Sequence, residues 1–298
     1  MARGEDTPLL GLDPRVEMTF PREGYYYLEI HDARFSAQGA NSYRLKTGSY
    51  AYARDLFPLG GKKGETVEVS LGAGASWRPT FEGSDRSRFR PLPVIIINWR
   101  DTITFGEGGL SAQLKGGRLR VGGGLTFDSG RKDHDTGGIF ANGDDRLAGM
   151  GDIDFALGVR GFAAYRVGPI EFNAAAIKYL GKQNDGVVAS LGASAPIPLG
   201  RKLLFIPGVR AGWADEKYMQ TFFGVTPLQA SRSIFPAFNA RSGLQEVRGS
   251  ANLIYRFNSH WFAAVNANVT RLMGDAAKSP ISITDTNSSV TTLLGYRF

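Results

Sequence analysis

Histidines and acidic residues are the side chains of this chain that could do catalytic chemistry, and they are few and scattered. The sequence has three histidines, His31, His134 and His260, and no cysteine. It contains no Gly-x-Ser-x-Gly elbow, phosphate-binding loop or His-Glu-x-x-His metal motif. We expect His134 and His260 at opposite ends of the molecule, too far apart to act on one substrate as parts of a single catalytic site. We interpret the pair His31-Asp32 as structural because it has no third partner. The sequence therefore predicts a protein that is not an enzyme and has no cofactor.

One acidic stretch has residues that could bind a divalent cation. Arg131-Lys132-Asp133-His134-Asp135 is followed by Asp144 and Asp145. Carboxylate oxygens are calcium ligands, but their order here is unlike that of an EF-hand. We therefore favour a solvated external loop over a metal site.

Composition excludes two further classes. The 35 Lys and Arg residues give a net charge of +7, but they are scattered singly rather than clustered, which argues against nucleic-acid binding. No apolar run approaches the ~20 residues that a membrane-spanning helix needs. The chain opens without a signal peptide, and we expect that an exported precursor has already lost it.

The elements that would position any site are strands with two different faces. Near the C-terminus, Val290, Leu294, Tyr296 and Phe298 share one face of an extended strand, while Arg297 lies on the other. A strand of this kind that ends in aromatic residues is typical of the closing strand of an outer-membrane barrel. We therefore predict an all-β, transmembrane antiparallel β-barrel.

The same alternation recurs from Thr66 onward in strands longer than those of soluble sheets, joined by connections of unequal length. We count eleven strands, near residues 66–78, 89–99, 102–114, 118–128, 152–167, 169–181, 186–197, 202–214, 244–257, 260–273 and 288–298. Because bacterial barrels have even numbers of strands, we predict twelve, with a strand upstream of Thr66 completing the wall. The alternative is ten, if two pieces between Phe89 and Leu114 are one crossing.

The first part of the chain has a different texture. We expect residues 1–64 to form a short β-rich segment and residues 65–298 to form the barrel. Residues 13–48 resemble a fragment of a pre-peptidase C-terminal β-sandwich module, in which the opening strands would be missing.

Three groups of barrel residues are candidate functional residues. Strand ends with tyrosine on the apolar face predict a periplasmic aromatic belt. Inward-facing arginines predict a basic lumen, which could be an anion-lined pore or be filled by pairing with Asp154, Glu171 and Glu246. An aromatic cluster inside a long loop predicts either a plug folded onto the barrel or a surface for a partner. The belt is Tyr165, Tyr255, Tyr296 and Phe298; the lumen group is Arg118, Arg120, Arg160, Arg210, Arg248 and Arg256; the loop group is Tyr218, Met219, Phe222, Phe223, Phe235 and Phe238.

Four stretches of the chain resemble the MipA/OmpV family of outer-membrane proteins, over residues of about 66–298. They are Phe81-Glu82-Gly83-Ser84-Asp85 with Arg90-Pro91-Leu92-Pro93, Gly149-Met150-Gly151-Asp152-Ile153-Asp154, Tyr218 to Pro227, and Leu272 to Pro280. The resemblance implies a Gram-negative outer-membrane location and contact with lipid. It also implies a scaffold that brings MltA, a lytic transglycosylase of peptidoglycan, together with a penicillin-binding protein.

Two other functions stay open at this point. A narrow pore or uptake channel with a basic lumen is the first alternative, and a surface adhesin is the second. The sequence leaves the oligomeric state open.

Overall fold

Antiparallel strands form most of the regular structure. The computed structural model describes residues 67–298 except 101, 107, 136 and 138–142. The predicted N-terminal segment, 1–64, and the module fragment, 13–48, lie outside these residues. The described strands are β1 (Val67–Pro79), β2 (Ser87–Trp99), β3 (Ile103–Gly106), β4 (Gly109–Gly116), β5 (Leu119–Asp128), β6 (Ala156–Val167), β7 (Ile170–Tyr179), β8 (Val187–Ser194), β9 (Ile197–Leu199), β10 (Leu203–Ala214), β11 (Gly243–Arg256), β12 (Trp261–Leu272) and β13 (Thr286–Arg297).

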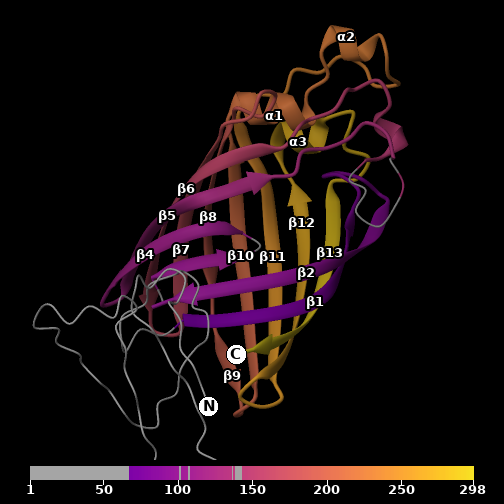
Figure 1. The fold of residues 1–298 in the computed structure, drawn as a ribbon. Helices are drawn as coiled ribbons and strands as arrows, with labels where there is room; N and C mark the ends of the chain where they lie inside the picture. Colours follow the sequence, from indigo (N-terminus) through magenta and orange to yellow (C-terminus); the bar gives the residue numbers. More distant parts are fainter. Residues whose placement is uncertain (1–66, 101, 107, 136, 138–142) are drawn as a thin grey trace, which may run out of the picture. The chain divides into compact units, whose positions relative to one another are not determined.

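The strands close into a ring (Figure 1). Neighbours in sequence pair antiparallel from β1 to β8, β10 pairs with both β8 and β11, and β13 pairs with β1. Because β9 continues β8 along the same edge of β10, these two form one crossing interrupted near Pro196. Within the described residues the wall thus has twelve crossings, the number predicted from the sequence.

The twelfth crossing has a different origin from the one predicted. No described strand lies between β1 and β13, which pair directly with each other. Instead, residues 102–114, predicted as one strand, form the hairpin of β3 and β4, in which Gly106 pairs with Gly109. Gly109 has a φ of 96°, a left-handed conformation that favours glycine. The run Gly106-Glu107-Gly108-Gly109 is a turn signal that the alternation around it masks.

The two faces of the wall differ as the alternation predicts. Apolar side chains such as Leu157, Leu253 and Val265 are exposed on the outside, where lipid would cover them. None of the described helices is long and apolar enough to cross a membrane. Aromatic residues stand at both ends of the outer surface: Trp77, Phe89, Phe127 and Trp213 at one end, and Tyr165, Tyr255, Trp261 and Phe298 at the other.

The two ends of the barrel differ in their connections. At one end, here called the turn end, glycines at positive φ such as Gly168 and Gly200 make tight turns. At the opposite end, here called the loop end, long segments connect β5 to β6, β10 to β11 and β12 to β13. Bacterial barrels have short periplasmic turns and longer external loops, so the turn end faces the periplasm.

Candidate functional site

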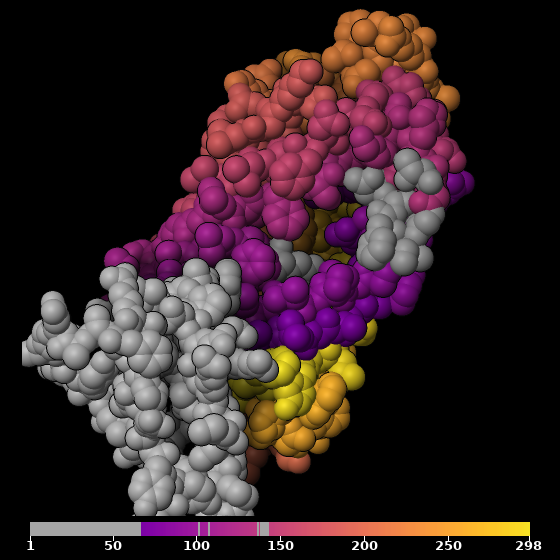
Figure 2. Space-filling model, in the orientation of Figure 1, coloured from indigo at the N-terminus to yellow at the C-terminus, as the bar shows by residue number. Residues whose placement is uncertain are grey.

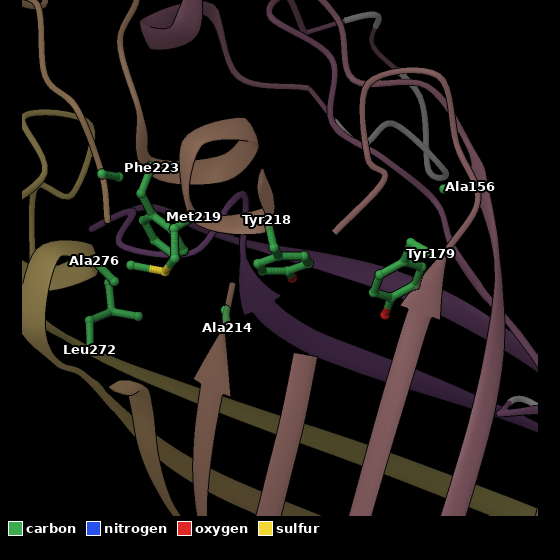
Figure 3. Close-up of a cluster of buried hydrophobic side chains, with 9 residues drawn as sticks. Ala156, Tyr179, Ala214, Tyr218, Met219, Phe223, Leu272 and Ala276 are labelled. Carbon is green, nitrogen blue, oxygen red and sulfur yellow. The ribbon is translucent and has the colours of Figure 1, made fainter. Parts of the chain in front are cut away.

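Helices cover the loop end of the barrel. The described helices are α1 (Glu216–Phe223), α2 (Pro227–Ala230), α3 (Gly274–Lys278) and the short 3-10 helix η1 (Asp145–Leu147). Figure 3 shows Tyr218, Met219 and Phe223 of α1 directed toward the strand ends, with Leu272 and Ala276 beside them. Met219 and Phe223 are fully buried. We call α1, α3 and the side chains buried beneath them the cap.

Local hydrogen bonds fix the position of α1. Asp215 begins the helix, since its side chain accepts a hydrogen bond from the Tyr218 N–H at 2.9 Å. At the other end, the Arg131 guanidinium donates to the Phe222 carbonyl at 2.9 Å, and the Ser279 hydroxyl donates to the Phe223 carbonyl at 2.6 Å. Carbonyls at the end of a helix have no partner inside it, so these two donors fasten α1 to two other loops.

A second buried cluster extends the cap over the loops. Phe235 packs with Leu147, Met150 and Ile281, and the half-buried Phe238 lies against both clusters. The six aromatic and methionine residues predicted as a plug or a partner surface therefore fold against the end of the barrel or against neighbouring loops, with Phe222 partly buried beside the first cluster. This packing favours the plug alternative, which stays a prediction.

A charged layer lies beneath the cap in the upper lumen. Glu246 on β11 is 4% exposed and accepts hydrogen bonds from Arg210 at 2.7 Å and from Arg248 at 2.9 Å. Two of the predicted lumen arginines therefore share one carboxylate, which balances only one of their two positive charges. Above them, Gln245 donates to Glu82 of the β1–β2 connection at 3.0 Å.

Glu82 has an unusual protonation equilibrium. Burial, reinforced by the nearby carboxylate of Glu246, raises the pKa of Glu82 from 4.5 to about 7. Glu82 also keeps solvent-exposed surface, which weakens the effect of burial on its pKa. A carboxyl whose pKa is raised on folding stabilises the folded state below its ordinary pKa, and this contribution is lost as the pH rises through the folded pKa.

We expect this loss of stability between pH 4.5 and about 7, the two pKa values of Glu82. The thermal unfolding midpoint of the parent should fall over this interval relative to that of Glu82→Gln, which cannot ionise. Glu216→Gln, at an exposed position on α1, is the control and should follow the parent. Parallel pH profiles for the parent and Glu82→Gln would contradict the assignment.

The other predicted lumen arginines lie at different levels of the barrel, with Arg160 in the loop-end half of β6 and Arg120 near the turn end of β5. Arg160 stands over the Phe162 ring, 5.1 Å from its centroid. Arg120 pairs with Glu171 at 2.6 Å. Arg118 and Arg256 are exposed at the turn end, at the rim of the barrel rather than inside it. Of the three carboxylates expected to pair with arginines, Glu171 and Glu246 do so, whereas Asp154 contacts Lys132 at 3.7 Å and Gln183 at 3.2 Å.

Asparagines occupy part of the remaining lumen. Asn266 donates to Asn252, Asn268 donates to Asn266, and Asn268 also reaches Ser289 at 3.4 Å. Paired arginines and this amide ladder occupy part of a lumen that is already narrow in a twelve-stranded barrel.

The turn end combines aromatic and basic side chains. Tyr296 contacts Trp261, Phe298 and His260 with ring centroids 5.1, 4.9 and 5.4 Å apart, and Tyr255 contacts Phe257 at 5.0 Å. Tyr165 is exposed at the end of β6 at the same level. The structure therefore places all four predicted belt residues at this end. Exposed basic residues surround them: Arg118, Arg166, Arg201, Lys202 and Arg256.

The histidines and the acidic stretch form no catalytic or metal centre in the described part of the chain. His260 lies in the β11–β12 turn, where it bonds only its neighbour Ser259 at 2.9 Å among described side-chain partners, and His134 lies at the loop end. No three acidic or histidine side chains among the described residues are placed to hold a metal ion. Asp133 and Asp144 accept hydrogen bonds from the Gly151 N–H and the Thr80 hydroxyl, so their oxygens hold loops together.

Comparison with known families decides what kind of barrel this is. Residues 71–298 match the family described as MltA-interacting protein MipA. The chain belongs to the MipA family. The match covers all twelve crossings except the first residues of β1. A MipA-family β-barrel is located in the outer membrane of a Gram-negative bacterium, in contact with its lipid, and the MipA family is not a known enzyme family.

Solved barrels are similar to this MipA-family chain only distantly. A loop-deletion mutant of OmpT, an outer-membrane protein of Vibrio cholerae, is 10% identical, with 78% of this chain and 99% of that chain covered and a TM-score of 0.37. Salmonella typhi OmpF, in complex with daunomycin, is 11% identical, with 78% and 97% covered and a TM-score of 0.33. No match to a curated protein was found.

Three residues of the MipA-family upper lumen were not predicted from the sequence. Glu82, Gln245 and Arg131 lie in or beside connections, and only tertiary structure brings them under one cap. Glu82 did lie within a stretch that carried the family resemblance, Phe81 to Asp85. The signal in the sequence was a single carboxylate between Phe81 and Gly83.

Proposed function

We propose that this MipA-family barrel is a scaffold whose turn end docks a periplasmic murein enzyme. Four basic side chains, Arg118, Arg201, Lys202 and Arg256, are exposed there without an ion-pair partner among the described residues. The carboxylates that the structure describes in the same region, Glu68 and Glu171, are already paired with arginines. This excess of unpaired positive charge on the periplasmic side is the observation that supports docking of an acidic partner surface.

The family's name, MltA-interacting protein, supports a lytic transglycosylase as that partner. A penicillin-binding protein is the second partner that we propose, held by the same scaffold. The role requires no catalysis by the barrel, so we also propose that the protein is not an enzyme.

The state of the lumen argues against a pore as the main function. A buried cap covers the loop end, and Arg210, Arg248 and Arg120 are paired with carboxylates instead of lining an open path. We expect purified protein in a planar bilayer to show no steady anion-selective conductance. Such conductance without capture of an enzyme would favour the narrow pore with a basic lumen.

Charge reversal at the turn end tests docking. In the test variant, Arg118, Arg201, Lys202 and Arg256 are all replaced by Glu. We expect this variant to bind a soluble lytic transglycosylase, from which the lipid anchor has been removed, at least tenfold more weakly than the parent at low salt. The reason is that each exposed ion pair contributes ~0.2–1 kcal/mol. Binding is measured with barrels in nanodiscs and the enzyme in solution. The matched control reverses four exposed basic residues of the loop end, Lys182, Arg232, Arg241 and Lys278, and should bind like the parent. Equal weakening in both variants would contradict docking at the turn end.

A further inference from the structure

One strand of the wall has an edge without a neighbouring strand. β2 pairs with β1 along its whole length, but on its other side only Ile97–Trp99 pair with the four-residue strand β3 in the described part of the chain. Figure 1 shows the resulting gap widening between β2 and β5. In Figure 2, atoms coloured for the C-terminal strands are visible through an opening between the indigo and magenta surfaces. We call this opening the window. Its described borders are Ser87–Ile96 of β2, the tip of the β3–β4 hairpin, the end of β5, and the loop in which Asp135 pairs with Arg88.

Two prolines lie on the open edge of β2. The Thr80 N–H donates to the Arg86 carbonyl at 3.0 Å, so these two residues form a hydrogen-bonded pair. Hydrogen-bonded pairs recur at every second residue of an antiparallel ladder, so the even-numbered residues of β2 direct their N–H and C=O groups toward β1. The backbone of the odd-numbered residues, including Pro91 and Pro93, therefore faces the window. Proline has no N–H, and in sheets it is confined to strand edges, ends and bulges. An unpaired N–H in lipid is costly, so the prolines remove two such groups from an edge that has no described partner strand over these residues.

The window opens into the hydrocarbon layer. Phe89 and Ile95 on β2 and Phe127 on β5 are exposed on the outer surface beside it. Phe89 and Trp99 are ten residues apart, which corresponds to ~34 Å along the strand and ~26 Å across a membrane at a strand tilt of ~40°. This distance matches the apolar band of ~25 Å in outer-membrane barrels. The unpaired edge begins at the loop-end side of this band, so the window faces the outer leaflet.

The lumen behind the window is mostly apolar, although barrel interiors are usually polar. A cavity of about 200 Å³ there is lined by Leu92, Val94 and Ile96 of β2 and by Ala264, Asn266, Thr291 and Leu293 of β12 and β13, so five of its seven lining residues are apolar. Between these strands β1 presents Gly72, where an added Cβ would lie 2.8 Å from Leu293 Cδ1. Both faces of β2 are therefore apolar over Pro91–Ile97, one toward lipid and one toward this cavity.

Arginines stand at the upper end of the same cavity. Arg78 and Arg88 are cross-strand partners, and Arg90 is opposite Ser76, so all three share the inner face of β1 and β2. Arg90 is only 9% exposed and its Nε has no hydrogen-bond partner, and neither Arg78 nor Arg90 has an ion pair among the described residues. Like charges at paired positions repel, so an anion here would stabilise the arrangement. Arg90 and Ile96 are six residues apart, ~20 Å along the strand.

We propose that the window admits an amphiphile with one apolar chain and one anionic head group from the outer leaflet into the lumen. The chain lies against Leu92, Val94 and Ile96, and the head group binds Arg78 and Arg90. A cavity of this volume is below the ~300 Å³ of a typical ligand pocket, which favours a single chain over a two-chain lipid. Carboxylate and phosphate heads both suit arginine.

Binding is tested with the full chain in nanodiscs and with dodecanoate and dodecyl phosphate as probes, beside neutral dodecanol. We expect one site that binds at least one anionic probe tenfold or more tightly than dodecanol; the tighter probe identifies the head group. Ala264→Phe fills the cavity from β12 and should abolish binding of all three probes, with Ala264→Leu used if the larger side chain prevents folding. Arg78→Gln with Arg90→Gln should weaken only the anionic probes, by tenfold or more.

Matched controls place equivalent changes on inner faces away from the window. Ala175→Phe on β7 and Arg160→Gln on β6 should bind like the parent. A dodecanoate analogue with a photoreactive group on its chain should label peptides from β2 and β13, and Ala264→Phe should remove this labelling. Uniform labelling of all strands, binding unaffected by Ala264→Phe, or equally tight binding of a two-chain phosphatidate would overturn the proposal.

Discussion

Replacing Phe223 with alanine is expected to open the cap. Phe223 is fully buried between α1, α3 and the strand ends, and truncating a buried phenylalanine costs about 3–5 kcal/mol because the cavity left behind only partly collapses. The cost should fall mainly on the cap, whose helices are short and depend on tertiary contacts. We therefore expect amide hydrogen exchange in α1 to accelerate by about 100-fold or more, while exchange in the strands stays slow.

An apolar residue of the same loop region provides the control for this experiment. Ile234 is 83% exposed, so Ile234→Ala should leave exchange in α1 unchanged. Planar-bilayer conductance of Phe223→Ala gives an independent measurement: if the cap seals the lumen, the variant should conduct more than the parent. Unchanged exchange in α1 would show that Phe223 does not hold the helix in place.

Arginine at Val209 should destabilise the barrel through its lipid face. Val209 is exposed on the outer surface of β10, four residues from Trp213 at the loop end and six from Leu203, which pairs with Tyr255. This position is near the middle of the apolar band, where an arginine on the lipid face costs about 2–4 kcal/mol. The free energy of unfolding is measured by urea titration in lipid vesicles, with heat-modifiable migration on gels as a second indicator of folding.

Depth in the membrane separates this effect from a general effect of charge. Leu253 is also exposed to lipid, but it lies two residues from Tyr255, close to the aromatic belt of the turn end. Leu253→Arg should therefore cost less than Val209→Arg, near the ~0–1 kcal/mol seen at interfaces. Equal costs at the two positions would be inconsistent with a membrane that spans the two aromatic belts.

The architecture could be predicted because lipid imposes a period of two on every strand. Outer residues such as Leu157 and Val265 are apolar for this reason, and the pattern can be read without knowledge of pairing partners. The short hairpin of β3 and β4 could not be separated by the same pattern. Its strands are too short to show their own period, and Gly106, Gly108 and Gly109 were the sole indication of a turn in the sequence.

The sites were harder to predict because they depend on contacts between distant segments. Glu171 and Glu246 could be matched with arginines because alternation places all of them on inner faces. Glu82 could not be assigned to the lumen, since the connection that carries it has no period. The window was equally hidden. In the sequence Pro91 and Pro93 indicate only a family resemblance, and their structural meaning depends on the absence of a neighbouring strand among the described residues.

The pairing of β1 with β13 also sets the order of events when the barrel forms. Arg297 pairs with Ser70, more than 200 residues away in the sequence, and the Phe298 N–H donates to the Val69 carbonyl at 2.9 Å. Contacts between such distant residues carry the largest loop-closure cost and make folding slow. Until β13 is in place, β1 and β12 each present an open strand edge that can pair with another chain. Closure is therefore the last step of assembly, and the nascent barrel needs protection from aggregation until its C-terminal strand has arrived.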